Sequence, residues 1–238
     1  MIRTYFFYFV LVSYLLLSGF AYLWYLLIGL FSKKLQYDYI HKMTASWGRL
    51  MVALSSSKVE LVNLQKIPEG NVLYVSNHQS NYDIPLLLGY LPKPKAYVAK
   101  IELSKVPIIS HWMRVMGCLF LDRGNLKQSL KVILQGIEDL KNGKTLVIFP
   151  EGTRSKNYTM GDFKKGSLKL GIKAGVPIVP ITIDGSFKMY EAKKAITKDH
   201  VRIIVHDPIY PSQLSKDEQD NLSDTVRNII MAPIFHLQ

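Results

Sequence analysis

Two side chains in the first third of the chain have the types and the spacing of a catalytic pair. His78 and Asp83 lie in the stretch 76–83, which leaves a β-rich run and enters a helical pattern. On one continuous helix they would lie about 140° apart, because each residue turns the helix by about 100°. They can meet if His78 lies in the loop and Asp83 in the first helical turn, and Pro85 supports a helix start there. The carboxylate would then fix the imidazole tautomer and leave the second ring nitrogen free as a general base.

The same two residues also fit a purely structural role. Asp83 could do no more than cap the helix, and His78 could be a loop residue bonded to the backbone. The spacing by itself leaves both roles open.

A second stretch, FPEGTRS at 149–155, offers groups that bind an anion. Gly152 allows a sharp turn that exposes backbone N–H groups. Thr153 adds a hydroxyl, and Arg154 adds a planar guanidinium that suits phosphate. The basic run 163–166 follows after a short loop. The pattern favours an anion site, although a solvated basic turn has the same composition.

Two further cations stand at the ends of predicted strands. Lys100 ends one apolar run and Arg123 follows another. The ends of neighbouring strands can converge on one cleft. Taken alone, each residue is more simply explained as a surface charge.

In this order, these stretches resemble the motifs of the glycerolipid acyltransferase family, and they look most like its lysophosphatidic acid acyltransferases. The family's motifs are N-H-x-x-x-x-D, G-x-x-F-x-x-R, F-P-E-G-T-R-S and an apolar strand that contains proline. The matching positions are Asn77, His78 and Asp83; Gly117, Phe120 and Arg123; 149–155; and 176–180. The resemblance covers about residues 58–210, and four motifs in order make it specific.

The resemblance implies acyl transfer from a thioester, acyl-CoA or acyl carrier protein, to the free 2-hydroxyl of lysophosphatidic acid. The product would be phosphatidic acid. His78 would act as the general base and Asp83 would orient and stabilise its imidazolium form. The reaction would need no metal and no bound cofactor.

The resemblance also implies a pocket for the substrate phosphate, made of three cations and the loop of the third motif. Its residues would be Lys100, Arg123, Arg154, Glu151, Gly152 and Thr153. Backbone N–H groups of that loop could also stabilise the oxyanion.

Other functions stay open. The acceptor could be another lysolipid or glycerol 3-phosphate, and a hydrolase would use water in its place. A catalytically inactive, membrane-attached lipid-binding module is a different class. Nucleic acid is disfavoured as a partner, because the chain has a long apolar start and no nucleic-acid recognition motif.

Residues 5–31 carry no charged side chain and predict a membrane-associated helix. At about 1.5 Å per residue it would be about 40 Å long, more than a hydrocarbon core of about 30 Å. Its length and the lack of a small-x-small site argue against a cleaved signal peptide. Its tyrosines and tryptophan favour the headgroup interface, so it could cross with tilt or lie in one leaflet. A buried core helix is the other possibility.

If the segment crosses, Lys33 and Lys34 against Arg3 place its carboxyl side in the cytosol. We therefore expect the protein on the cytoplasmic face of a membrane, the inner membrane if the source is bacterial.

A second helix should follow, because apolar residues recur every three or four positions. One face would carry Ile40, Met43, Trp47, Leu50, Met51 and Leu54, and the opposite face Asp38, Lys42, Ser46 and Arg49. The two helices would form a hairpin that ends at the serines 55–57. The predicted domains are therefore this membrane-associated helix pair, 1–57, and an acyltransferase α/β domain, 58–238.

From residue 58 onward, short apolar runs alternate with helical periods. Strands are predicted at 58–63, 71–77, 95–100, 117–122, 145–150, 176–183 and 201–209, and helices from 83, within 106–116, at 125–142 and at 213–231. In the clearest helix Asn125 can cap the start and Gly143 stands just past the end. The alternation predicts an α/β fold with a mixed or largely parallel sheet flanked by helices.

The composition excludes several classes of protein. Among 238 residues, 48% hydrophobic and 20% charged residues exclude global disorder. The net charge of +12 suits an anionic partner such as a membrane surface, a phosphorylated substrate or an acidic protein. A single cysteine, Cys118, excludes an internal disulfide, and its apolar neighbours indicate a core residue. The chain has no G-x-S-x-G elbow, no G-x-G-x-x-G loop and no metal-ligand spacing of histidines.

Overall fold

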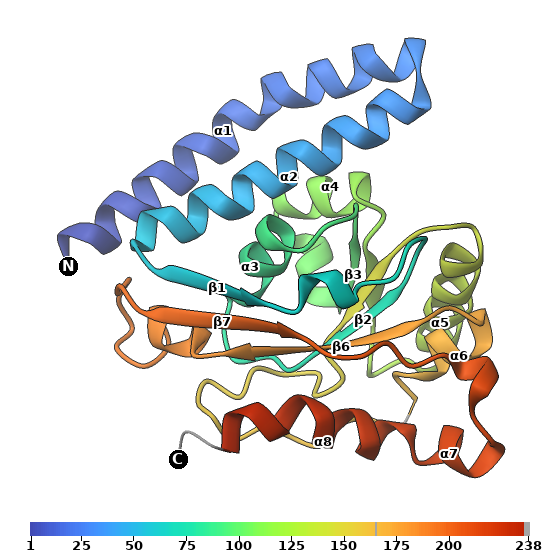
Figure 1. Cartoon of the computed structure of the whole chain (residues 1–238). Helices are drawn as coiled ribbons and strands as arrows, with labels where there is room; N and C mark the ends of the chain where they lie inside the picture. The colour runs from blue at the N-terminus through green and yellow to red at the C-terminus, as the bar shows by residue number, and fades with distance from the viewer. Residues whose placement is uncertain (165, 236–238) are drawn as a thin grey trace.

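A seven-stranded sheet organises the part of the chain that the structure, a computed structural model, describes: residues 1–164 and 166–235 (Figure 1). The strands are β1 Lys58–Val62, β2 Leu73–Ser76, β3 Ala96–Lys100, β4 Leu119–Leu121, β5 Leu146–Ile148, β6 Ile178–Asp184 and β7 His200–Val205. Their order across the sheet is β1-β7-β6-β2-β5-β3-β4. Neighbouring strands are parallel except β6 and β7, which are antiparallel. The predicted mixed sheet is confirmed.

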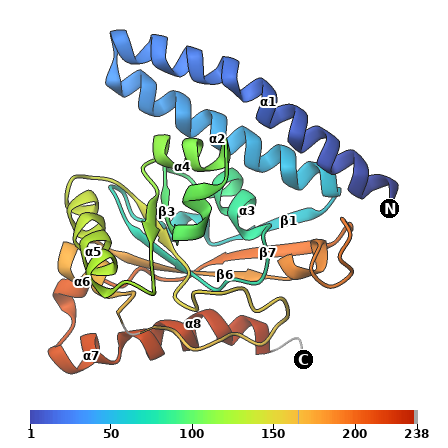
Figure 2. The ribbon, with the colours of Figure 1, turned by 180° about the vertical axis from the view of Figure 1, so that it is seen from behind.

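Helices cover both faces of this sheet (Figures 1 and 2). They are α1 Ile2–Phe31, α2 Lys33–Ser55, α3 Asp83–Tyr90, α4 Ile109–Val115, α5 Leu126–Lys141, α6 Lys169–Ala174, α7 Lys216–Asp220 and α8 Leu222–Phe235, with short 3₁₀ turns η1 Leu64–Lys66, η2 Ile101–Lys105, η3 Ser186–Met189 and η4 Pro211–Gln213. In both views α1 to α4 lie on one side of the sheet and α7 and α8 on the other.

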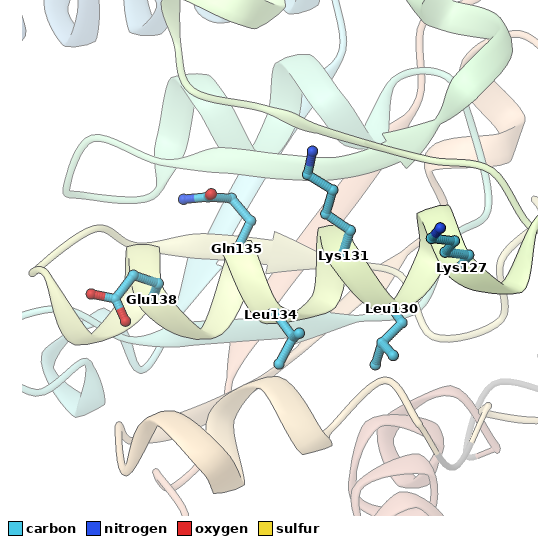
Figure 3. A pocket seen from close by; sticks show the side chains of 6 residues that line it. All are labelled: Lys127, Leu130, Lys131, Leu134, Gln135 and Glu138. Carbon is cyan, nitrogen blue, oxygen red and sulfur yellow. The ribbon is translucent and has the colours of Figure 1, made fainter.

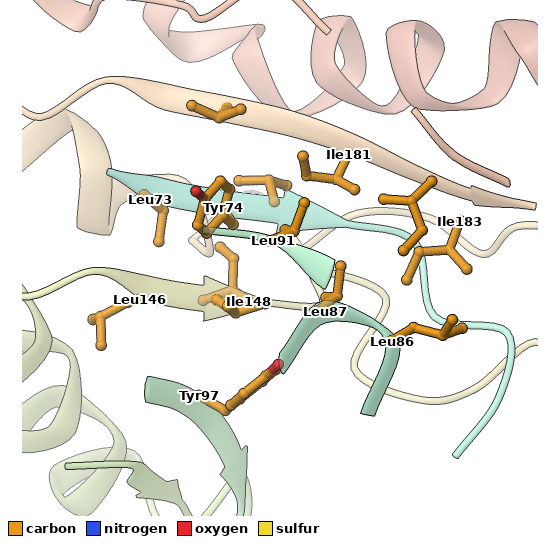
Figure 4. Close-up of a cluster of buried hydrophobic side chains, with 14 of the residues drawn as sticks. Leu73, Tyr74, Leu86, Leu87, Leu91, Tyr97, Leu146, Ile148, Ile181 and Ile183 are labelled. Carbon is orange, nitrogen blue, oxygen red and sulfur yellow. The ribbon is translucent and has the colours of Figure 1, made fainter. Parts of the chain in front are cut away.

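The central strands are buried on both faces, which explains their continuous apolar runs. All residues of β2 and β5 are buried, and so are Ile181 and Ile183 of β6. Leu86 and Leu87 of α3 complete this core (Figure 4). A parallel sheet needs such cover on both sides, because neither face can be left to water.

The parallel strands bring the sequence motifs to one edge. β2, β5, β6, β3 and β4 all run in the same direction, so their carboxyl ends lie together. The segments that leave these ends contain His78, Phe149 to Ser155, Ser186, Lys100 and Arg123. This edge is where ligands usually bind in open α/β sheets.

The end of the chain differs from the prediction of one helix at 213–231. Ser215 caps α7 through a capping box with Glu218, which sets the helix start at Lys216. The helix stops at Asn221 and a second one, α8, begins at Leu222. Only α8 packs on the sheet, where Val226 is fully buried. The single apolar period therefore concealed two helices with different surroundings.

The predicted helical hairpin is present. Ser32 separates α1 from α2 and caps α2 by accepting a hydrogen bond from the N–H group of Leu35. Along its length α1 also contacts the rest of the protein: Ile196 N donates to Thr4 Oγ1, and Trp112 Nε1 donates to Ser18 Oγ at 2.9 Å. Most of the apolar side chains of α1 are nevertheless exposed, so the helix is not a buried core helix.

The predicted apolar face of α2 is confirmed in part, because Ile40 and Met51 are buried and Trp47, Leu50 and Leu54 pack against the core. Small residues outside that prediction, Thr44, Ala45 and Gly48, are buried as well. Arg49, predicted to face away, donates from Nη1 to Gly89 O at 2.9 Å. A Cβ added at Gly48 would lie 2.5 Å from Pro85 O, so the two backbones are in close contact. Hydrophobic periodicity does not report such an interface.

The division of the chain into domains at residue 57 stays a prediction.

This contact gives a testable expectation. Gly48→Val should lower the free energy of unfolding by about 1–3 kcal/mol, because the helices must separate to admit the side chain. Thermal unfolding in detergent measures the change. Gly19→Ala is the matched control, because a Cβ at Gly19 meets nothing within 4 Å. Equal thermal stability of the wild type and Gly48→Val would contradict the close contact.

Candidate active site

The Asn77 side chain fastens the loop after β2 to the neighbouring strand. Its Oδ1 accepts a hydrogen bond from Ile183 N, and its Nδ2 donates to Ile183 O, both at 2.8 Å. Asn77 is 1% exposed, so water cannot replace these bonds. The Asn77 side chain thus bonds β6 in the way that a backbone amide would, just beyond the end of β2. It thereby fixes the position of the next residue, His78.

His78 and Asp83 meet directly. His78 Nδ1 lies 2.7 Å from Asp83 Oδ2, and the same oxygen accepts the N–H groups of Gln79 at 2.7 Å and Ser80 at 2.8 Å. Backbone N–H groups can only donate, so Oδ2 is an acceptor and His78 Nδ1 carries the proton that points at it. In the neutral imidazole, the lone pair is then on Nε2.

Asp83 does more than cap a helix. It is the first residue of α3, and the N–H groups that it binds come before the helix rather than from its first turn. Its Oδ1 accepts a further hydrogen bond from the Ser186 hydroxyl, and the residue is fully buried. The alternative of a cap alone is wrong, because every one of these bonds holds the loop around His78.

Two residues of the FPEGTRS stretch fix the imidazole from the other side. The ring of His78 stacks on Phe149 with centroids 4.1 Å apart. Glu151 accepts from His78 N at 2.7 Å through Oε1 and from Gly161 N at 2.8 Å through Oε2. Burial raises the pKa of Glu151, and these two N–H groups oppose that rise. Glu151 therefore ties three segments together beneath His78.

Position 152 requires glycine for two reasons, its backbone conformation and the close approach of Arg123. Its φ is +73°, and a Cβ there would lie 2.4 Å from Arg123 Nη1. The Arg123 guanidinium covers this glycine and donates to Gly152 O. Gly152 N donates to Phe149 O at 3.0 Å, so this N–H group is not free to stabilise an oxyanion.

Three cations gather beside this turn. The charge of Arg123 is the main reason that the pKa of Lys164 is lowered, followed by burial and then by the charge of Lys100. Lys164 belongs to the basic run 163–166, of which Lys165 lies outside the described residues. Mutual repulsion of this kind is relieved when an anion binds among the cations. The group Lys100, Arg123 and Lys164 is hereafter the cation cluster.

Arg154 is held elsewhere. Its Nη1 lies 3.1 Å from Glu191 Oε1, and Glu191 also accepts from Ser80 Oγ and from Asn81 N. Arg154 is thereby fixed against the loop that carries His78 rather than against Arg123. Thr153, next to it, is exposed.

A cavity of about 300 Å³ lies beside Phe149, the residue on which the His78 ring stacks. It lies between β3, β4, β5 and α5, and its lining includes the apolar side chains of Val98, Leu121, Val132, Ile133, Ile148, Phe149 and Leu170. Arg123 and Lys164 are also in the lining. An apolar space with cations in its wall suits a ligand that has both a hydrocarbon part and an anionic part.

Sequence patterns did not reveal several supporting residues. Ser186, Gln79 and Glu191 lie outside the recognised motifs or at variable positions within them, and their partners are distant in the chain. Only folding brings them to the pair. Cys118 is buried, as expected for a core residue, and burial raises its thiol pKa to about 12, which is the environment of a structural cysteine rather than of a nucleophile. Within residues 1–164 and 166–235, no group of three His, Cys, Asp or Glu side chains could hold a metal ion.

An imidazole held by a buried carboxylate, next to a cation cluster and an apolar cavity, is typical of an enzyme that uses a general base on an anionic amphiphile. Comparison with known proteins identifies the family. The sequence model of the Acyltransferase family matches residues 58–184. The chain therefore belongs to the acyltransferase family.

Individual relatives agree. A probable 1-acyl-sn-glycerol-3-phosphate acyltransferase of Mycoplasma pneumoniae is 35% identical over 190 residues, 74% of this chain and 71% of that protein. A 1-acyl-sn-glycerol-3-phosphate acyltransferase of Saccharomyces cerevisiae is 32% identical over 200 residues, 79% of this chain and 65% of that protein. The crystal structure of the 1-acyl-sn-glycerophosphate (LPA) acyltransferase PlsC from Thermotoga maritima superimposes with a TM-score of 0.87 and 30% identity, covering 99% of this chain and 95% of that one.

The role of Asn77 can be tested by stability alone. Asn77→Ala should lower the free energy of unfolding by about 2 kcal/mol or more, because it leaves the buried Ile183 N–H and C=O groups without partners. Urea unfolding in detergent measures the loss. Asn81→Ala, an exposed asparagine in the same loop, should leave stability within about 0.5 kcal/mol. A small effect of Asn77→Ala would show that the two bonds are replaceable.

Proposed function

We propose that the protein transfers an acyl chain from a thioester to the 2-hydroxyl of lysophosphatidic acid and so forms phosphatidic acid. The observation that carries the proposal is the 2.7 Å contact between His78 Nδ1 and Asp83, which leaves Nε2 as a base at the edge of the sheet. The names of the relatives support lysophosphatidic acid as the acceptor. Other lysolipids and glycerol 3-phosphate are compared in the test below.

In the proposed reaction His78 Nε2 takes the proton of the acceptor hydroxyl. At the same time the hydroxyl oxygen attacks the carbonyl carbon of the thioester. The C–O bond forms, the C–S bond breaks, and the thiolate leaves with the proton from the imidazolium. Asp83 stabilises that imidazolium, because its carboxylate is already fixed at Nδ1. The oxygen attacks directly, so no covalent enzyme intermediate, metal or bound cofactor is needed. The donor is acyl-CoA or acyl carrier protein.

We assign the substrate phosphate to the cation cluster together with Arg154. Lys164 and Arg123 line the cavity, and relief of their repulsion would favour a doubly charged phosphate. Arg154, oriented by Glu191, would approach from the His78 loop. Gly152 lets Arg123 lie over the turn, and Glu151 holds that turn to His78. Thr153 is exposed and would offer its hydroxyl and N–H group.

The α1–α2 hairpin would place this site at the membrane. α1 is long and apolar enough to cross a bilayer, but it packs lengthwise on α2, which carries Lys33, Lys34, Asp38, Lys42 and Arg49. We propose that the exposed face of α1 enters one leaflet at the cytoplasmic surface, since a crossing α1 would draw these charged side chains of α2 into hydrocarbon. The exposed side chains include Phe6, Phe9, Leu16, Leu17, Phe20, Leu23, Trp24, Leu27 and Leu30. Both the lipid acceptor and the lipid product would then remain in the bilayer.

The base is tested with purified protein in lipid vesicles that contain lysophosphatidic acid. His78→Ala should reduce phosphatidic acid formation by about 10³-fold or more, because the hydroxyl proton has no acceptor. His200→Ala, a surface histidine paired with Glu60, is the matched control and should retain wild-type activity. Substantial turnover by a folded His78→Ala protein would remove His78 from this role. Other lysolipids and glycerol 3-phosphate, assayed alongside, identify the preferred acceptor.

The phosphate pocket is tested by comparing an acceptor that carries a phosphate with one that does not. Arg123→Leu and Arg154→Ala should each raise the KM for lysophosphatidic acid about tenfold or more, since each removes a charge-assisted bond to phosphate. The same variants should change the use of monoacylglycerol far less, because that acceptor has no phosphate. Lys216→Ala, an exposed lysine on α7, serves as the control. Equal losses with both acceptors would mean that the arginine only supports the fold.

A further inference from the structure

Helix α5 has one broad apolar face, and the fold buries only part of it. Ser129, Val132 and Ile133 line the cavity beside the active site. On the outer side Leu126, Leu130 and Leu134 are 86%, 55% and 58% exposed, and they recur every four residues. An exposed leucine stripe of this length on an amphipathic helix indicates a surface that another molecule covers.

The stripe is accompanied by positive charge. Lys127 and Lys131 are exposed next to the leucines, and Gln135 and Glu138 belong to the same open surface of the helix (Figure 3). Helix α6 packs beside α5 and adds the exposed Lys169 and Lys173. The outer face of α5 is defined here as Leu126, Lys127, Leu130, Lys131, Leu134 and Glu138.

The membrane orientation proposed for α1 does not place the bilayer against this face. In Figure 3 Leu130 and Leu134 point to the side of α5 away from the α1–α2 hairpin. In Figures 1 and 2 the hairpin lies at one end of the molecule, with α5 and then α6 progressively farther from it. When the exposed face of α1 lies in a membrane, the leucines of α5 therefore point away from that membrane.

Two other occupants can be compared with an acidic protein. A second copy of this chain, bound through the same face, is one of the outcomes of the test below. A nucleic acid would match the lysines but would leave the leucine stripe without an apolar partner. An acidic protein with apolar side chains between its carboxylates satisfies both features of the surface.

We propose that the outer face of α5 docks an acidic acyl carrier protein that delivers the thioester to the cavity on the inner face of the same helix. The inference rests on the proposed function and adds the donor and its binding surface. α5 begins three residues after Arg123, so a carrier bound along it stands close to the cation cluster.

The test compares two donors on one enzyme. Lys127→Glu/Lys131→Glu should raise the KM for acyl carrier protein thioester about tenfold or more, because attraction becomes repulsion. The same variant should use acyl-CoA within about twofold of wild type, because the cavity and the cluster are untouched. Leu130→Ser/Leu134→Ser should give the same selective loss without changing charge. Lys193→Glu/Lys198→Glu, exposed lysines remote from α5, is the charge-matched control.

Each other outcome overturns the docking surface. Unchanged kinetics with the carrier thioester, or equal losses with both donors, would exclude α5 as the docking site. Use of acyl-CoA but never of the carrier thioester would reject the partner and leave the proposed function intact. No turnover with either donor would reject the proposed function itself. A change in oligomeric state of the leucine variant, measured by light scattering, would identify a second copy as the occupant instead.

Discussion

The buried carboxylate of Asp83 is the constraint around which the active edge is built. A fully buried charge is costly unless several donors surround it, and here they come from two segments far apart in the chain. The His78 ring and the N–H groups of Gln79 and Ser80 reach it from the loop after β2, and Ser186 reaches it from the turn after β6. Because these groups must converge, the loop and the strand ends are fixed relative to each other, and the imidazole is fixed with them.

The parallel sheet makes that convergence possible. Its strand ends meet at one edge, which brings Arg123 and Lys100 close enough to Lys164 for their charges to lower the pKa of Lys164. The core of β2, β5 and β6 therefore holds three cations near one another, an arrangement that suits the phosphate of the proposed substrate.

The remaining apolar surfaces match the physical form of the proposed substrates. The exposed face of α1 suits a lipid surface, the cavity beside Phe149 suits a hydrocarbon chain, and the outer face of α5 suits an acidic carrier. α1 and α5 lie in different parts of the molecule in Figures 1 and 2, so a lipid surface and a carrier would approach from different directions. The net charge of the chain, +12, attracts each of these proposed anionic partners.

Much of this protein is readable from its sequence. The uncharged segment 5–31, the alternation of strands and helices, the Asn125 cap of α5, and the four motifs follow from residue type and spacing, because they depend on neighbours within a few positions. Tertiary structure alone decided the rest. The close α2–α3 contact at Gly48, the ion pair of Arg154 with Glu191, and the support of Asp83 by Ser186 join residues far apart in the chain. Such contacts leave no periodicity in the sequence, since their geometry exists only after the sheet has placed both partners.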